Sequence, residues 1–254
     1  MKHIIKFITR FVSRQTMQRF AIFFLRIIGF FMRGKKITDP ISGKSYRKLL
    51  PYGRQEVRKN ALAPHSASLE RHRVIWLYLQ AETTIFREPT KFLHIAPEYC
   101  FLKKFKKMPN IDYITGDWDS PWADMKLDVR ALPFDDNTFD AAMCNHVFEH
   151  VDDDRLAMSE FYRVLKPGGW AIFQVPIRWD KTTFEDPSIT DPRERERLFG
   201  QSDHVRYYGA DYSDRLKEAG FKVTIEDYAS KLGDEKIKKY ALLRDEKIVF
   251  CEKL

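Results

Sequence analysis

The residues from 128 to 176 constrain the fold more than any other part of the chain, because a helical pattern lies between two apolar runs. The runs are FDAAMCN at 139–145 and GWAIFQV at 169–175. Between them, Met158, Phe161, Tyr162 and Leu165 recur at the spacing of one helical face. Aspartates at 152–154 put negative charge at the expected helix start, and the Pro-Gly-Gly at 167–169 is expected to stop the helix. The pattern predicts a right-handed crossover between parallel strands.

Polar side chains follow the first of these two strands. Ligands of open parallel sheets bind beyond the carboxyl ends of the strands, so we expect Asn145, His146, Glu149 and His150 at the rim of a pocket. The spacing H-x-x-E-H also occurs in zinc sites, which offers a second interpretation of the same residues.

The segment LPFDDNTFDAAMCNHVFEHV, followed by RVLKPGGWAIFQVP, resembles the second half of a class I S-adenosylmethionine-dependent methyltransferase domain of the methyltransferase type 11 kind. The resemblance extends from about residue 91 to the C-terminus. It implies an α/β fold with a Rossmann-like, doubly wound, seven-stranded sheet, mostly parallel with an antiparallel final strand. It also explains residues 145–150 as the rim of a cofactor pocket, so we expect no metal there. A metal knuckle is not expected in the connector either, since no cysteine precedes Cys100.

The resemblance also implies which residues hold the cofactor. In the first strand and its exit, KFLHIAPE at 91–98, His94 stands at the family's acidic position and Ala96 at a glycine position, and Glu98 is expected near the methionine amino group. After the second strand at 111–116, Asp117 is the first choice and Asp119 the second for the ribose hydroxyls. Trp118 is expected to pack on the adenine. The remaining assignments are the adenine edge, for Asp128 and Val129, and the pocket rim, for Asn145.

A long polar segment at 177–209 follows the fifth strand and is expected to cover the pocket as a substrate lid. Methyl transfer from a sulfonium needs a base only when the acceptor is a hydroxyl or a protonated amine, and His146 and His204 are the candidates. Glu185, Asp186, Asp203 and Arg206 could contact the substrate. Equally, such charged residues could form only the ion pairs that order the lid.

The charge of the chain is concentrated at its N-terminus. Of 44 Lys and Arg residues, nine lie within residues 1–38, which hold no acidic residue, so 35 basic residues face 36 acidic ones in the remainder. These cations interleave with long apolar side chains, as in FAIFFLRIIGFFM at 20–32. The pattern favours a helix lying on an anionic membrane surface, with a bend near 13–18. Packing on the domain or on a second subunit is the alternative; a true membrane span is less favoured, and nucleic acid least.

These observations predict three regions: a basic apolar helical arm at 1–36, a turn-rich connector at 37–66, and a methyltransferase domain at 67–254. Three widely spaced cysteines suggest a reducing cytoplasm. The basic apolar arm suggests peripheral association at the inner membrane. We therefore expect a methyltransferase acting on a small-molecule, glycan or lipid-linked acceptor. The alternatives are a non-catalytic binding module with the same fold and an NAD-dependent oxidoreductase. The second is disfavoured because no G-x-G-x-x-G follows a strand. The pattern leaves the oligomeric state open.

Overall fold

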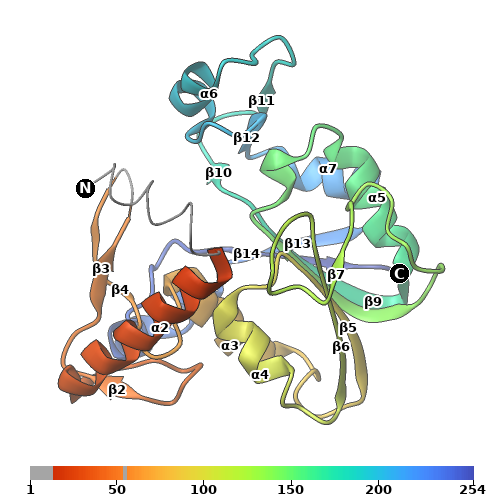
Figure 1. The fold of residues 1–254 in the computed structure, drawn as a ribbon. Helices are drawn as coiled ribbons and strands as arrows, with labels where there is room; N and C mark the ends of the chain where they lie inside the picture. The colour runs from red at the N-terminus through yellow and green to blue at the C-terminus, as the bar shows by residue number, and fades with distance from the viewer. Residues whose placement is uncertain (1–13, 54–55) are drawn as a thin grey trace. The chain divides into compact units, whose positions relative to one another are not determined.

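The computed structural model describes residues 14–53 and 56–254. Lys2, Lys6 and Arg10 of the predicted basic arm therefore lie outside the described residues. The chain forms two compact units. The first comprises the described residues of Met1–Phe86 with Glu98–Lys107 and Asp227–Glu246. The second comprises Arg87–Pro97, Met108–Glu226 and Lys247–Leu254. Figure 1 shows their elements.

The second unit is built on a seven-stranded sheet in the order β13-β14-β9-β8-β5-β6-β7. The strands β5, β6, β7, β8 and β9 run parallel to one another, while β14 is antiparallel to both β9 and β13. This confirms the predicted Rossmann-like sheet with its antiparallel end. The strand bounds are β5 Thr90–Ile95, β6 Ile111–Asp117, β7 Met125–Lys126, β8 Phe139–Asn145, β9 Leu165–Gln174, β13 Lys222–Glu226 and β14 Ile248–Glu252.

The crossover from β8 to β9 contains a 3-10 turn, η1 (Phe148–His150), and the helix α5 (Asp154–Val164). Asp153 caps α5, since its side chain accepts a hydrogen bond from the Leu156 amide at 3.0 Å. The prediction that the Pro-Gly-Gly at 167–169 stops this helix was wrong. The helix ends at Val164, because Leu165 already pairs with Phe139 as the first residue of β9.

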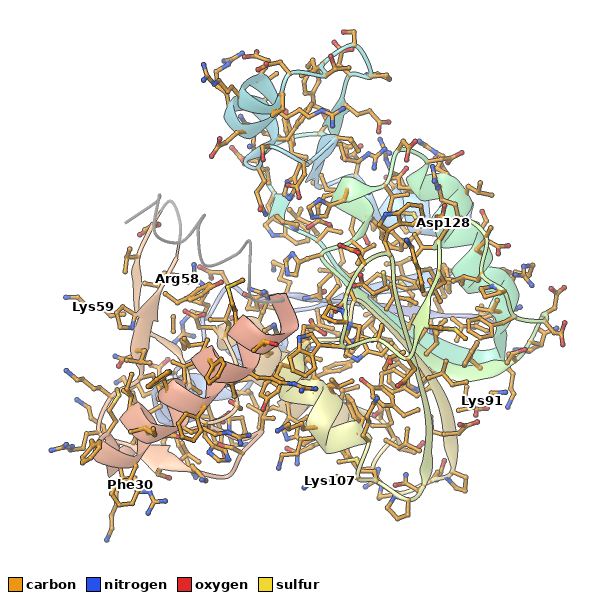
Figure 2. All side chains as sticks on the ribbon, viewed as in Figure 1. Phe30, Arg58, Lys59, Lys91, Lys107 and Asp128 are labelled. Carbon is orange, nitrogen blue, oxygen red and sulfur yellow. The ribbon has the colours of Figure 1, made fainter. Side chains whose placement is uncertain are left out.

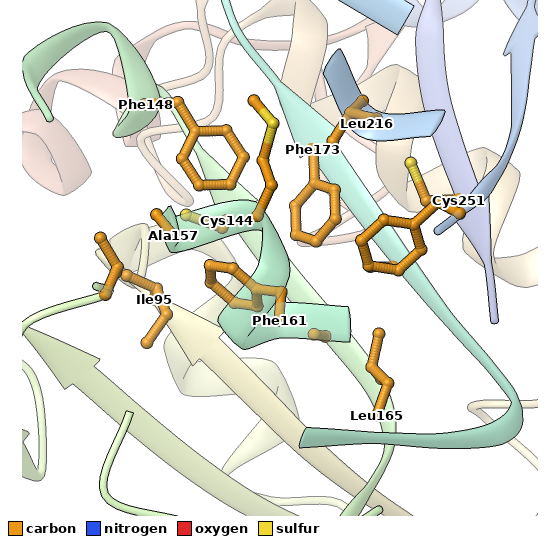
Figure 3. Packing of buried hydrophobic residues seen from close by; sticks show 14 of the residues in the cluster. Ile95, Cys144, Phe148, Ala157, Phe161, Leu165, Phe173, Leu216 and Cys251 are labelled. Atoms are coloured by element: carbon orange, nitrogen blue, oxygen red, sulfur yellow. The ribbon is translucent and has the colours of Figure 1, made fainter. Parts of the chain in front are cut away.

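One face of the sheet is covered by α5 and by α7 (Tyr212–Glu218), as Figures 1 and 3 show. Phe161 from α5 and Leu216 from α7 are fully buried there beside Phe173 of β9. The opposite face of β5, β6, β9 and β14 carries contacting aromatic rings: Phe92, His94, Tyr113, Trp170 and Phe250. Residues alternate between faces along a strand, so His94 and its neighbour Ile95 point in opposite directions.

The segment 177–209 has secondary structure of its own. It contains β10 (Ile177–Arg178), β11 (Phe184–Glu185), α6 (Pro192–Phe199) and β12 (Arg206–Gly209), and the three strands form a small sheet in the order β10-β12-β11. Asp191 caps α6 by accepting hydrogen bonds from two amides of its first turn, and Gly200 ends the helix in the left-handed conformation.

The first unit contains the helix α2 (Arg14–Phe31), two small antiparallel sheets and four further helices. The first sheet pairs β1 (Arg33–Thr38) with β2 (Ser45–Tyr46), and the second pairs β3 (Leu50–Tyr52) with β4 (Arg58–Leu62). The helices are α3 (Glu70–Glu82), α4 (Tyr99–Phe105), α8 (Tyr228–Lys231) and α9 (Gly233–Tyr240). Among the described residues, no helix combines the length and hydropathy needed to span a membrane.

Ser68 and Arg73, near the start of α3, make buried hydrogen bonds. Ser68 does not cap the helix, because its hydroxyl donates to Asp39; the cap residue is Leu69, whose amide donates to His72 Nδ1 at 3.0 Å. Arg73 of α3 is fully buried. Its guanidinium donates to four backbone carbonyls at 2.6 to 3.1 Å, which replace the water it has lost.

Candidate functional site

A cavity of about 450 Å³ lies in the second unit at the carboxyl ends of β5, β6 and β8. Its lining comes from residues at or just beyond strand ends, at 95–96, 117–118, 127–130 and 146–147, with 150–152 from η1 and its exit. The structure brings six of the predicted site residues together here: Ala96, Asp117, Trp118, Asp128, Val129 and His146.

Two residues of the lining have left-handed backbone conformations where a strand ends. Ala96 has φ of 50° after β5, and His146 has φ of 56° after β8. Their amides still donate to neighbouring strands, Ala96 to the Gly116 carbonyl at 2.9 Å and His146 to the Gln174 carbonyl at 2.7 Å. The first of these conformations explains why a glycine is expected at position 96. Strained backbone of this kind concentrates at functional sites.

The carboxylate of Asp117 is held in place by backbone amides. Its Oδ1 atom accepts hydrogen bonds from the amides of Asp119 at 2.7 Å and Ser120 at 2.6 Å. Trp118 beside it exposes 62% of its surface, and the Lys126 ammonium lies 5.3 Å from its ring centre. A fixed acceptor and an exposed aromatic face therefore stand together at the end of β6.

On the next wall, Asp128 (labelled in Figure 2) accepts from the Arg130 side chain at 2.7 to 3.1 Å. Hydrogen bonding from that guanidinium lowers the pKa of Asp128, so the carboxylate stays ionised. Arg130 also reaches Asp152 at 2.9 Å, which links two segments of the lining. Arg130 was missed by sequence reasoning, because nothing separates it from other surface arginines before the fold is known.

Three predicted cofactor residues lie elsewhere. His94 is fully buried on the aromatic face of the sheet, where its Nδ1 is 2.7 Å from the Tyr113 hydroxyl. Asn145 is a buried residue at the end of β8, next to His146 in sequence and not itself in the lining. Glu98 belongs to the first unit and precedes α4, with its carboxylate 3.8 Å from His72 Nε2.

A cluster of polar side chains surrounds η1. Glu149 Oε1 lies 3.3 Å from His146 Nδ1, and His150 Nδ1 lies 3.4 Å from Asp203 Oδ2. His204, the other predicted base, is buried beside His150 with ring centres 4.6 Å apart. Burial lowers the pKa of His204, which keeps its imidazole neutral.

The segment 177–209 is tied to this cluster by buried ion pairs. Arg206 of β12 donates to Glu185 at 2.6 Å and to the carbonyls of Phe148, Val151 and Asp152 around η1. Arg215 of α7 donates to Glu185 at 2.9 Å and to Asp154. Glu185 and Arg206, two of the candidates for substrate contact, therefore lie in ion pairs that order the segment.

The strand order, the cavity at the strand ends and the acidic residue after β6 together define the class I S-adenosylmethionine-dependent methyltransferase fold. Residues 102–173 match the family described as a methyltransferase domain, Methyltransf_11. Residues 102–173 thus match a class I methyltransferase domain of this family, whose cofactor is S-adenosylmethionine.

Curated relatives match over short segments. The ubiquinone/menaquinone biosynthesis C-methyltransferase UbiE of Desulfotalea psychrophila is 50% identical over 42 residues, covering 16% of this chain and 17% of the relative. The demethylmenaquinone methyltransferase of Renibacterium salmoninarum is 38% identical over 64 residues, covering 25% of this chain and 22% of the relative. The matches thus span about a fifth of the length of these relatives.

Solved structures share the fold. The cyclase SpnF superposes with a TM-score of 0.50 at 17% identity, covering 85% of this chain and 91% of that chain. A methyltransferase from Mesorhizobium loti gives a TM-score of 0.45 at 12% identity, over 70% of this chain and 97% of that chain. A fold that also serves a cyclase does not by itself fix the reaction.

Proposed function

We propose that this chain transfers a methyl group from S-adenosylmethionine, bound in the 450 Å³ cavity, to an acceptor presented at an anionic membrane surface. The cofactor assignment rests on one observation: six predicted site residues line a single cavity at the strand ends. The acceptor and its location rest on α2 and on the segment 177–209.

The cavity fits the cofactor in size and in chemistry. Its volume lies within the roughly 300–1,000 Å³ of ordinary ligand pockets. We assign Asp117 to the ribose, because a carboxylate oriented by two backbone amides can accept from both hydroxyls. The left-handed turn at Ala96 would let the backbone approach the methionine part closely.

We assign the adenine to the wall formed by Trp118, Asp128 and Val129. The exposed ring of Trp118 offers a stacking surface, and the Asp128 carboxylate can accept from the exocyclic amine. Arg130 already donates to Asp128, so adenine would share this acceptor with the guanidinium. Outside the lining, we assign the buried His94 and Asn145 to support of the strand ends, and the role predicted for Glu98 stays a prediction.

The cofactor, when bound, supplies a methyl group on a sulfonium, and the protein must align an acceptor with it. His146 lines the cavity and contacts Glu149, so we assign it the removal of a proton from a hydroxyl or protonated amine. His204, the other predicted base, is buried outside the lining and is neutral, so any catalytic role for it would act through its neighbours.

The helix α2 supports a membrane surface as the place of reaction. Phe20, Phe23, Phe24, Ile27 and Phe31 follow a helical spacing and expose between 42% and 70% of their surfaces. Figure 2 shows side chains projecting along this helix. Its other side packs within the first unit, where a β-carbon on Gly29 would come within 2.8 Å of Pro64.

The charge of this region supports an anionic bilayer as the partner of the apolar face. The described residues from 14 to 38 include no acidic side chain, and Arg19, Arg33, Lys35 and Lys36 are exposed. Cations flanking an apolar helical face bind anionic headgroups while the apolar residues enter the acyl boundary. We therefore infer that the acceptor is a glycan or a lipid-linked molecule at the cytoplasmic face, covered by the polar segment 177–209.

Flotation with liposomes tests the membrane proposal on the full chain. Replacing two rings, Phe23→Ser with Phe24→Ser, removes roughly 2 kcal/mol of apolar transfer and should lower partition onto anionic liposomes about thirtyfold. Leu254→Ser, which changes another exposed apolar side chain, should leave partition unchanged. Equal partition of all three proteins would favour protein packing as the role of α2.

Methyl transfer is tested with methyl-labelled S-adenosylmethionine and fractionated cell extracts. We expect label to enter a lipid-extractable or glycan fraction, with release of S-adenosylhomocysteine. A protein that binds the cofactor and labels no fraction would support the alternative of a non-catalytic binding module. Binding of NAD in place of S-adenosylmethionine would support the oxidoreductase alternative.

A further inference from the structure

Three side chains able to bind a metal converge in the second unit. Glu149 and His150 come from η1, His204 precedes β12, and one ligand atom of each lies within 4.8 Å of the other two. We propose that these residues bind one divalent transition-metal ion of the zinc class.

Two buried acceptors of this cluster lack a hydrogen-bond donor. His204 Nδ1 lies 3.1 Å from the Phe199 carbonyl, which can only accept, so Nδ1 carries the ring proton and Nε2 carries a lone pair. Within the described part of the chain, neither His204 Nε2 nor Glu149 Oε2 has a hydrogen-bond partner, although both residues are at most 4% exposed. A buried acceptor without a donor is unfavourable. A bound cation would satisfy both atoms.

The donor set matches the chemistry of zinc and its neighbours. Imidazole nitrogen with carboxylate oxygen suits Zn²⁺, Fe²⁺ and Ni²⁺, whereas Mg²⁺ prefers oxygen ligands alone. Tetrahedral ligands of Zn²⁺ lie roughly 3.3 Å apart, so the present atoms need to approach by at most about 1.5 Å. Side-chain rotation at His150, whose side chain is 33% exposed, can supply much of this approach.

Each of the three residues also has an outer partner, as metal ligands usually do. The Phe199 carbonyl orients His204, the Asp203 carboxylate lies 3.4 Å from His150 Nδ1, and His146 Nδ1 lies 3.3 Å from Glu149 Oε1. These contacts help to orient the three side chains, each of which offers one ligand atom within 4.8 Å of the other two.

The backbone holds the two contributing segments together without a metal. The Val205 amide donates to the Glu149 carbonyl at 2.9 Å, and Arg206 donates to the carbonyl of Phe148 at 2.8 Å and to that of Asp152 at 2.7 Å. The ligands therefore sit on a preformed scaffold, which reduces the cost of ordering them on binding.

The sequence alone favoured the pocket-rim interpretation of H-x-x-E-H, because the family resemblance explains the same residues. His204 lies 54 positions after His150, and only the fold brings the two together. The first histidine of the motif, His146, stands outside the triad as a partner of Glu149.

The triad has a consequence for the reaction, and this consequence rests on the proposed function. Three protein ligands leave a fourth position of a tetrahedral ion open. His150 belongs both to the triad and to the lining of the cavity. An oxygen atom of the acceptor could therefore occupy the open position, which would orient the acceptor toward the cofactor.

The test is calorimetry on the full chain after removal of metal with a chelator. We expect Zn²⁺ to bind with one ion per chain, Mg²⁺ to bind far more weakly, and Co²⁺ to give the visible absorption of a low-coordinate site. Glu149→Gln and His150→Ala should each weaken Zn²⁺ binding at least about hundredfold, since losing even an outer partner costs roughly 10- to 100-fold. His65→Asn, a histidine of the first unit, should leave binding unchanged.

Circular dichroism establishes that each protein is folded, and His150→Ala is the safer variant because its side chain is partly exposed. Failure of the folded wild-type chain to bind Zn²⁺ would overturn the proposal. Binding that is unaffected by both variants would overturn it as well. A parallel titration with S-adenosylmethionine separates the two claims, because failure to bind the cofactor would remove the proposed function and leave the metal site standing.

Discussion

We predict that the buried ion pairs around η1 anchor the segment 177–209. Asp154 is 2% exposed and accepts from Tyr208 Oη at 2.7 Å and from Arg215 Nη1 at 2.9 Å. Arg206 Nε lies 3.8 Å from the same carboxylate. The change Asp154→Asn keeps the shape of the side chain and removes its charge, which leaves two guanidiniums to share the carboxylate of Glu185.

Removing one partner of a buried ion pair costs about 3–5 kcal/mol, because the remaining charge is uncompensated. Glu185 still neutralises part of this charge, so we expect a loss of about 3 kcal/mol in the free energy of unfolding. Urea denaturation followed by circular dichroism measures this loss, and limited proteolysis should show earlier cleavage within 177–209.

The matched control lies two positions away. Asp152 also pairs with an arginine, Arg130, but its side chain is 82% exposed, so Asp152→Asn should cost no more than about 1 kcal/mol. A loss below about 1 kcal/mol for Asp154→Asn, or equal losses for the two variants, would refute the inference that this network anchors the lid.

Two further predictions concern single side chains. Arg73→Met leaves four buried carbonyls without their donor, so it should destabilise the protein by about 3–5 kcal/mol in urea denaturation; a loss under 1 kcal/mol would show that water replaces the guanidinium. Hydrogen bonds from Arg163 lower the pKa of Glu160. The Glu160 carboxylate therefore contributes to the free energy of unfolding above about pH 4.3, the ordinary pKa of glutamate. This contribution is lost as the pH falls through the lower pKa of the folded state. The stability advantage of wild type over Glu160→Gln should therefore shrink between pH 5 and pH 3 in paired denaturation curves, and a constant difference would contradict this assignment.

Much of the second unit was predictable because its signals are local. The run FDAAMCN is β8 to the residue, and the apolar segments at 111–116 and 222–226 lie in β6 and β13. Each is a continuous or alternating pattern bounded by turn residues, which depends little on distant parts of the chain. The confirmed seven-stranded sheet follows from these segments and their order.

What could not be predicted depends on contacts between distant segments. The burial of Arg73 could not be predicted, since no local pattern marks an arginine whose donors meet carbonyls more than 160 positions away. The helix end at Val164 was missed because pairing of Leu165 with Phe139 overrides the Pro-Gly-Gly that follows. The contact of His204 with η1 could not be predicted for the same reason, because it joins distant segments of the chain. The candidate cofactor residues, by contrast, stand at strand ends, where order along the chain already places them.

Calorimetric titration of the full chain determines whether the cavity at the ends of β5, β6 and β8 holds S-adenosylmethionine. We expect saturable binding with one cofactor per chain. Asp117→Ala should weaken binding at least tenfold, the equivalent of about 1.4 kcal/mol, through loss of the ribose acceptor. Asp112→Ala, an exposed aspartate near the opposite end of the same strand, should leave binding unchanged. Two results would contradict this assignment of the cavity: folded wild-type protein that does not bind S-adenosylmethionine, or equal affinities in the two variants.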